Sequence, residues 1–236
     1  MEKAKVYLGV PSYDNRVYGE FVTAMVQSSK TNVIHKLEIS GTSWLTRNFN
    51  KLYCSALNLR SKGYTHFCLL HDDVIPQTPF WMDLMLDIMD REKADVLSAI
   101  VPIKDSRGFT STGLDEKVGE HDQRWRIRRL TLHEVYTDFP PTFTHENILL
   151  NTGLLLIDIT KPHAENIVFK FDDQIVPNPQ KPGEFMAAGF PEDWGFSREA
   201  NKLGLRLFAT REIQATHMGG GRWSNAGIWG SKQKDE

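Results

Sequence analysis

Short apolar segments alternate with amphipathic segments over the first hundred residues, and this alternation constrains the fold more than any other feature. Residues 6–10, 33–39, 67–70 and 96–101 are compact apolar segments, rich in β-branched or aromatic residues, as buried strands are. Between them, apolar residues recur at helical spacing. The pattern favours an α/β fold in which helices flank a mostly parallel central sheet with right-handed crossovers.

Helices are predicted over 17–28 and 44–59, after Thr78, and over 194–203. Thr78 is expected to cap the third helix, and Asp193 is a candidate N-cap of the fourth. Beyond residue 103 the pattern weakens. The remaining predictions are an acceptor-side insertion over 104–147 (a loop or small antiparallel excursion), a strand over 148–159, a surface loop over 176–189, short strands over 205–208 and 212–216, and a flexible tail over 218–236.

The composition indicates one globular domain over residues 1–236, with a formal net charge of −2. So small a charge excludes non-specific nucleic-acid binding through the overall field. Cys54 and Cys68 are too few for a disulfide framework or a four-thiolate zinc site. No segment approaches the roughly 18 apolar residues of a membrane span, and the N-terminus does not read as a signal peptide. We therefore expect a cytoplasmic protein.

His71, Asp72 and Asp73 follow a predicted buried strand, so they are expected at the sheet edge where α/β proteins bind ligands. If the chain stays extended there, His71 and Asp73 share one face and Asp72 lies on the other. Carboxylates with an imidazole suit Mg²⁺ or Mn²⁺. The alternative is that one carboxylate caps a turn before Pro76.

Glu192 and Asp193 precede the predicted helix 194–203, where a carboxylate can cap the helix or act as a general base toward a bound hydroxyl. His217 ends a short predicted strand and is followed, after Met218, by three glycines. Its imidazole is a candidate metal ligand, although a lone histidine is more often structural.

Two further segments suggest a nucleotide site. Arg47 and Asn48 lie at the start of the predicted helix 44–59 and either contact a phosphate or stand on an exposed helix surface. Pro11, Ser12, Tyr13 and Asp14 follow the first strand, where Tyr13 can stack on a base and Asp14 can accept hydrogen bonds; the alternative is a plain turn. The chain lacks the GxxxxGK[ST], GxGxxG and GxSxG motifs, which disfavours a P-loop kinase, a dinucleotide-dependent oxidoreductase and an α/β-hydrolase.

The order of several short motifs resembles that of GT-A glycosyltransferases, most closely the family 2-like branch. The motifs are VPSYD (10–14), TRN (46–48), HDDV (71–74), NTG (151–153), PEDW (191–194) and His217-Met218-Gly219. The likeness extends from Val6 to Gly219, but nothing supports it over 104–147. One departure is His71, which stands where the family usually has its first Asp.

The resemblance implies a role for each matching residue. Nucleotide binding falls to Pro11, Ser12, Tyr13, Asp14, Arg47, Asn48, Asp72 and Gly153; metal binding falls to Asp73, His71 and His217; and the catalytic base is Asp193 or Glu192. The implied activity is transfer of a sugar from a nucleoside-diphosphate donor, with UDP favoured, to a hydroxyl acceptor, assisted by Mn²⁺ or Mg²⁺. With Asp193 as base the reaction inverts the anomeric centre, whereas a retaining enzyme does not need that base.

Two other functions remain open. A nucleotidyltransferase also uses an α/β sheet, but its glycine- and arginine-rich signature is missing after the first strand. The other is a non-catalytic module that binds a nucleotide-sugar. Arginines around Trp125 indicate an anionic acceptor or simply alternating charge on an exposed strand; they are Arg124, Arg126, Arg128 and Arg129.

Overall fold

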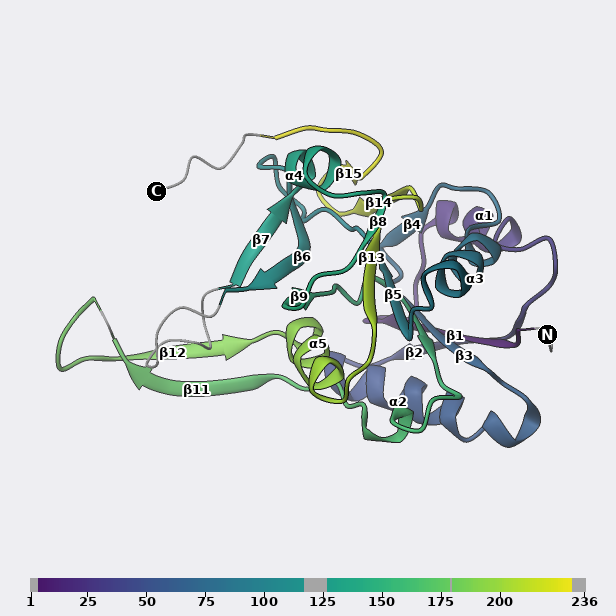
Figure 1. Ribbon diagram of the computed structural model, residues 1–236, viewed down its shortest axis with the longest axis horizontal. Helices are drawn as coiled ribbons and strands as arrows, with labels where there is room; N and C mark the ends of the chain where they lie inside the picture. The colour runs from purple at the N-terminus through teal and green to yellow at the C-terminus, as the bar shows by residue number, and fades with distance from the viewer. Residues whose placement is uncertain (1–3, 117–126, 179, 231–236) are drawn as a thin grey trace.

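Helices and strands alternate along the chain in the computed structural model, which describes residues 4–116, 127–178 and 180–230 (Figure 1). The helices are α1 (Gly19–Val26), α2 (Leu45–Leu57), α3 (Trp81–Glu92), α4 (Leu132–Thr137) and α5 (Glu192–Lys202), with 3-10 turns at Arg60–Lys62 and Ala164–Asn166. The strands are β1 (Val6–Ser12), β2 (Ile34–Gly41), β3 (His66–Leu70), β4 (Val74–Pro76), β5 (Val96–Ala99), β6 (Phe109–Asp115), β7 (Ile127–Thr131), β8 (Thr142–Phe143), β9 (Ile148–Leu149), β10 (Leu154–Asp158), β11 (Asp172–Pro177), β12 (Phe185–Phe190), β13 (Leu207–Thr210), β14 (Ala215–Met218) and β15 (Arg222–Ser224).

Seven strands of the described ranges form the central sheet, in the order β2-β1-β3-β10-β5-β13-β8. Strands β2, β1, β3, β5 and β13 run in one direction, and β10 and β8 run in the other. The prediction of an α/β fold with a mostly parallel sheet is confirmed. The carboxyl ends of β1, β3 and β5 consequently meet at one edge, where ligands of α/β sheets bind.

Helices cover both faces of this sheet. Helices α1 and α3 pack on one face through residues such as Phe21 and Trp81, and α2 and α5 pack on the other through residues such as Phe49, Tyr53 and Phe196 (Figure 1). All seven residues of β1 are buried. Coverage on both sides is the reason that the central strands are continuous apolar segments in the sequence.

Two local predictions are wrong because side chains find distant partners. Helix α3 begins at Trp81 with Phe80 as N-cap, whereas the Thr78 hydroxyl accepts a hydrogen bond of 2.8 Å from the backbone of Gln214. The strand expected over 148–159 is divided into β9 and β10. Between them, the Asn151 amide donates to the carbonyl of Ala99 at 2.7 Å, and this hydrogen bond holds the connection out of a regular strand.

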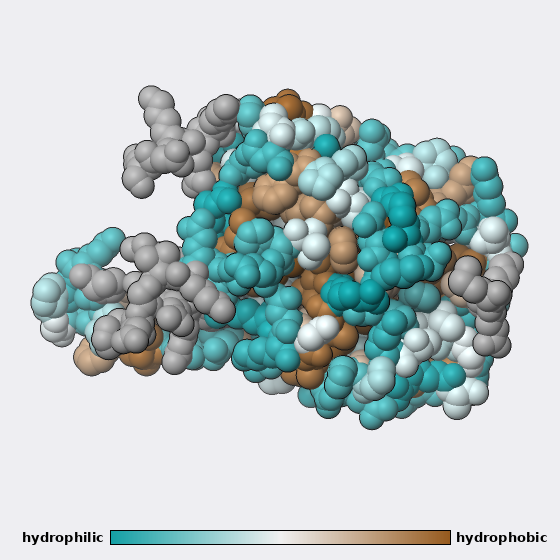
Figure 2. Space-filling view, in the orientation of Figure 1, coloured by the Kyte–Doolittle hydropathy of each residue, from teal (hydrophilic) through white to brown (hydrophobic). Residues whose placement is uncertain are grey.

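The surface loop predicted over 176–189 is wrong: β11 and β12 form an antiparallel hairpin that extends from the body of the molecule as an arm (Figure 1). At the connection between the two strands, the N–H of Asn178 donates to the carbonyl of Glu184 at 2.9 Å. The arm leaves Ile175 81% and Phe185 71% exposed. Figure 2 shows hydrophobic atoms on the arm, beyond the mostly hydrophilic surface of the body.

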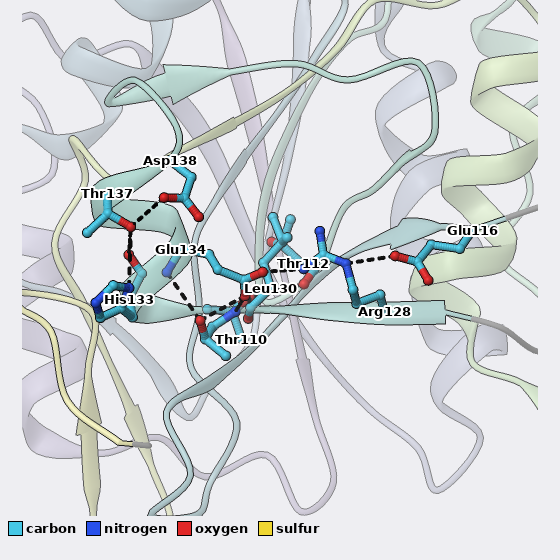
Figure 3. Close-up of polar contacts among 10 residues, drawn as sticks. Thr110, Thr112, Glu116, Arg128, Leu130, His133, Glu134, Thr137 and Asp138 are labelled. Atoms are coloured by element: carbon cyan, nitrogen blue, oxygen red, sulfur yellow. Dashed lines mark hydrogen bonds and ion pairs between the residues drawn. The ribbon is translucent and has the colours of Figure 1, made fainter. Parts of the chain in front are cut away.

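Within the segment predicted as an insertion over 104–147, the described residues 104–116 and 127–147 contain a small antiparallel excursion, one of the two predicted alternatives, and it contributes to the core. Strands β6 and β7 pair with each other and β6 pairs with β9, while Leu130 and Leu132 are fully buried in the core. The Glu134 carboxylate closes a capping box with Thr131 at the start of α4 and pairs with Arg128, which also pairs with Glu116 (Figure 3).

The described part of the predicted flexible tail, up to residue 230, instead packs on the body. It contains β15, which pairs with β14, and the fully buried side chain of Asn225. None of the helices in the described ranges combines the length and the apolar character needed to cross a membrane.

Candidate functional site

The turn His71–Asp73 lies at the carboxyl end of β3. The backbone N–H of Val74 donates to the carbonyl of His71 at 3.1 Å, so the chain turns here. The prediction that His71 and Asp73 share one face holds only for an extended strand and does not apply to this turn. The N–H of His71 donates to the carbonyl of Gly153 at 2.9 Å. A Cβ at Gly153 would lie 3.2 Å from Val74 Cγ2, a contact so tight that Val74 would have to shift by a few tenths of an ångström. The structure therefore brings the NTG and HDD segments together.

Asp73 is the most strongly paired carboxylate of this edge. Its Oδ2 forms an ion pair with Lys104 Nζ and lies 3.6 Å from His217 Nε2, while its Oδ1 is buried and has no hydrogen-bond partner in the part of the chain described. Burial opposes ionisation, but the neighbouring His217 and the ion pair with Lys104 outweigh it and hold the pKa of the Asp73 carboxyl well below its ordinary value.

His217 reaches Asp73 from β14. Its Nδ1 lies 2.7 Å from the carbonyl oxygen of Pro102. A carbonyl oxygen only accepts, so Nδ1 carries the hydrogen and Nε2 faces the carboxylate of Asp73. The backbone N–H of Met218 donates to the carbonyl of Asp73 at 2.7 Å, which fastens the end of β14 to the turn.

His71 is held mainly by packing. Its ring centroid lies 5.2 Å from that of Phe49, and its Nε2 lies 3.5 Å from the hydroxyl of Thr152. Burial lowers the pKa of His71 to about 4, with Asp73 opposing the effect and His217 and Lys104 adding to it. His71 is therefore neutral at pH 7.

These side chains do not fit a metal site of their own. Within the described ranges, no group of three or more His, Cys, Asp or Glu side chains could hold a metal ion. Lys104 already supplies a positive charge to Asp73 Oδ2, and the single free oxygen, Oδ1, falls far short of the oxygen-rich shells that Mg²⁺ and Mn²⁺ prefer. The described side chains therefore do not form a set of ligands for the Mn²⁺ or Mg²⁺ ion expected from the sequence.

The loop after β1 approaches the same turn. Ser12 is buried and its hydroxyl donates to the carbonyl of Arg16 at 3.1 Å, while Tyr13 is 79% exposed. Burial raises the pKa of Asp72, the nearby Ser12 opposes the rise, and the charges of Asp73 and Asp14 add to it. Asp14 accepts a hydrogen bond from the N–H of Arg16 at 3.1 Å. Ser12 and Asp14 of the predicted nucleotide site therefore lie near Asp72, whereas Pro11 is buried inside β1.

Arg47 and Asn48 differ in their surroundings. Arg47 is exposed on α2, whereas Asn48 is only 1% exposed, so the alternative of a helix-surface asparagine is wrong. The amide of Asn48 donates to the carbonyl of Ser40 at 2.5 Å, and its Oδ1 is buried without a partner among the described residues. Asn48 therefore ties α2 to the carboxyl end of β2.

Asp193 and Glu192 lie in the first turn of α5, and Pro191 is the N-cap, so the prediction that Asp193 caps the helix is wrong. Asp193 Oδ1 accepts a hydrogen bond from the N–H of Trp194 at 2.8 Å. Burial, and then the charge of Glu192, raise the pKa of Asp193 to about 7 against the opposing effects of the Trp194 N–H and Arg129. Burial also raises the pKa of Glu192.

The segment 150–153, between β9 and β10, contacts both α5 and the turn after β3. The N–H of Leu150 donates to Ser197 Oγ on α5 at 2.8 Å, and the Gly153 carbonyl accepts from the His71 N–H at 2.9 Å. Helix α5 and the turn are therefore hydrogen-bonded to the same short connection.

The predicted arginine cluster does not act as one surface in the described residues. Arg128 is paired with two carboxylates, and Arg129 places its guanidinium carbon 4.6 Å from the centre of the Trp194 ring. Arg124 and Arg126 lie outside the described residues. Only Arg129 is therefore placed beside Asp193, whose charge acts on it.

Lys104 is the site residue that sequence reasoning missed. Its position in the sequence could have identified it, because Lys104 is a single cation that follows the predicted strand 96–101 and Pro102. Strand ends on this side of an α/β sheet are where ligand-binding residues are expected.

Comparison with known proteins adds information on the fold alone. No protein-family model matches the chain, and no curated protein is similar to it. The fold is similar to that of A197 from STIV, with a TM-score of 0.55 and 15% identity over 98% of this chain and 97% of that one. At so low an identity the likeness shows a shared fold and nothing more.

Two other solved structures align more weakly, with a TM-score of 0.39 each. One is described as a UDP-N-acetylglucosamine pyrophosphorylase from Entamoeba histolytica, 11% identical over 88% of this chain and 73% of that one. The other is apo UDP-glucose pyrophosphorylase, 9% identical over 90% and 76% of the two chains. A TM-score of this size does not establish a shared fold.

Proposed function

We propose that the protein transfers a sugar from a nucleoside-diphosphate donor, with UDP as the favoured nucleotide, to a hydroxyl acceptor. The observation that carries the proposal is Asp193, a half-buried carboxylate in the first turn of α5, whose pKa is raised to about 7. A general base works best when its pKa lies near the working pH.

In the proposed reaction, the acceptor oxygen attacks the anomeric carbon from the side opposite the diphosphate. The hydroxyl proton passes to Asp193 Oδ, a new bond forms from the acceptor oxygen to the anomeric carbon, and the bond from that carbon to the diphosphate oxygen breaks. The electron pair leaves on the diphosphate, and the configuration inverts. Glu192 has a positioning role, because its charge helps to keep the pKa of Asp193 high.

The donor is proposed to lie along the carboxyl ends of β1 and β3. The exposed ring of Tyr13 is available to stack on a base, and Asp14 can accept hydrogen bonds from its polar edge. Arg47, exposed on α2, is available for a phosphate, and Gly153, which the resemblance assigns to the nucleotide site, accepts the hydrogen bond from the N–H of His71. The proposal specifies the acceptor only as a hydroxyl group.

The test is release of nucleoside diphosphate from a panel of UDP- and GDP-linked sugars, with Asp193→Asn compared with the wild type. The amide cannot take the proton, so turnover is expected to fall by about 10²–10⁴-fold while donor affinity survives. Glu199→Gln is the matched control, because Glu199 lies on the same helix but pairs at the surface with Lys202.

Unchanged turnover in Asp193→Asn would contradict the proposal. Release or consumption of pyrophosphate would indicate a nucleotidyltransferase instead. Binding of a nucleotide-sugar with neither reaction would indicate the non-catalytic module.

A further inference from the structure

Among the described residues, Lys104 is the only lysine whose ammonium group forms an ion pair with the acidic turn after β3. It follows β5, and its Nζ contacts Asp73 Oδ2; the side chains of the two residues are 38% and 25% exposed. An ammonium has three N–H donors. One is used by Asp73, and the partial exposure leaves the others accessible from the ligand-binding edge.

The surrounding backbone makes room for this side chain. A Cβ at Gly219 would lie 2.8 Å from Lys104 Cδ, closer than two carbon atoms can approach, so a glycine at this position lets the lysine pass. The adjacent N–H of Met218 is fastened to the carbonyl of Asp73 at 2.7 Å. The ends of β3, β5 and β14 thus meet at the Lys104 side chain.

His217 and Lys104 both lie beside Asp73 Oδ2. The Nδ1–H of His217 donates to the carbonyl of Pro102 at 2.7 Å, and its Nε2 lies 3.6 Å from Asp73 Oδ2. Lys104 forms the ion pair with the same oxygen, so it brings a positive charge to this point from within the chain.

We propose that Lys104, in place of a divalent metal ion, is the cation that binds the donor diphosphate and stabilises the negative charge that develops on it as the sugar leaves. The inference rests on the proposed function for the identity of the leaving group. Lys104 contacts phosphate oxygens in this role, and Asp73 and Gly219 position it. Diphosphate binding then requires no added metal.

The experiment is calorimetric titration of the full chain with UDP, inorganic pyrophosphate and uridine, in EDTA and again with Mn²⁺. The wild type is expected to bind UDP and pyrophosphate with affinities that agree within about twofold in the two conditions. Lys104→Met is expected to weaken both by roughly 10–100-fold, the usual effect of losing a charge-assisted hydrogen bond. Lys104→Arg keeps the cation and should retain most of the affinity.

Two controls separate a lost phosphate contact from a damaged fold. Uridine carries no phosphate, so its affinity should be the same in Lys104→Met and the wild type. Lys202→Met removes a surface lysine that pairs with Glu199 at 3.0 Å, and it should bind all three ligands normally.

The outcomes also separate this inference from the proposed function. Binding of UDP that requires Mn²⁺, or that survives in Lys104→Met, would overturn the role of Lys104 and leave the glycosyl-transfer proposal standing. Metal-independent, Lys104-dependent binding of pyrophosphate without binding of UDP would support Lys104 and contradict the nucleotide donor. Absence of binding by every phosphate ligand in both conditions would overturn both.

Discussion

At the residue scale, Asp193 is kept in an environment that favours its protonated form, and this has a cost in stability. Its pKa is about 7 in the folded chain, against about 3.9 for an ordinary Asp. Between these values the unfolded chain releases a proton that the folded chain keeps. Stability is therefore lost as pH rises through this window, and the loss is complete above pH 7.

Asp193→Asn is accordingly expected to stabilise the fold while it removes the proposed base. The gain should be larger at pH 8 than at pH 5 by about 2–3 kcal/mol, or about 4–12 °C in Tm for a chain of this size. Thermal unfolding followed by circular dichroism at the two pH values measures it. An equal Tm difference at both pH values would show that Asp193 has an ordinary pKa, and Glu199→Gln should change little at either.

At the scale of elements, helix α4 has only six residues and depends on its capping box. Glu134 Oε2 accepts from both the N–H and the hydroxyl of Thr131 at 2.8 Å, and Oε1 pairs with Arg128. Glu134→Ala is expected to lower the free energy of unfolding by about 1–2 kcal/mol. Urea titration gives the value, and Glu146→Ala, at an exposed position, is the control; equal midpoints for the two variants would refute a capping role.

For the arm formed by β11 and β12, we expect substitutions to leave the free energy of unfolding almost unchanged. Ile175 and Phe185 are largely exposed, so replacing both with Ser should change the free energy of unfolding by no more than about 0.5 kcal/mol. Phe169→Ala, just before the arm and 1% exposed, should cost about 3–5 kcal/mol. A large loss in urea titration of the double Ser variant would mean that the arm packs on the body.

At the scale of the whole molecule, Asn225 joins parts of the chain that are far apart in sequence. Its amide donates to the carbonyls of Ile100 at 2.7 Å and Ile213 at 2.9 Å, its Oδ1 accepts from the N–H of Ala215 at 2.8 Å, and its own carbonyl accepts from the Tyr136 hydroxyl. The end of β5, the start of β14 and helix α4 are thereby held together.

Asn225→Ala leaves two buried carbonyls and one buried N–H without partners. The expected loss is roughly 2–4 kcal/mol, which corresponds to a decrease in Tm of about 5–15 °C. Differential scanning calorimetry measures this loss. Ser224→Ala, which removes one bond of 3.1 Å to the N–H of Ala226, should lower Tm much less; similar effects of the two substitutions would contradict the anchoring role.

The parts of the fold that were predictable are those with a local cause. Burial on both faces makes a strand such as β1 continuously apolar, and helices such as α2 repeat apolar residues at helical spacing, so both can be read from neighbouring residues. The positions of the carboxylates after β3 and before α5 followed from the same pattern. The β11–β12 hairpin could not be found in this way, because its pairing joins residues such as Ile175 and Ala187 across a connection rich in turn residues.

The amino-acid sequence by itself determined the α/β class, the mostly parallel sheet and the presence of acidic groups at its carboxyl edge, because each depends on spacing along a few neighbouring residues. Only the tertiary structure decided that Asp73 pairs with Lys104, 31 residues away, and that burial raises the pKa of Asp193 to about 7. Charge pairing and desolvation depend on which groups are close in space, and spacing along the chain does not specify that.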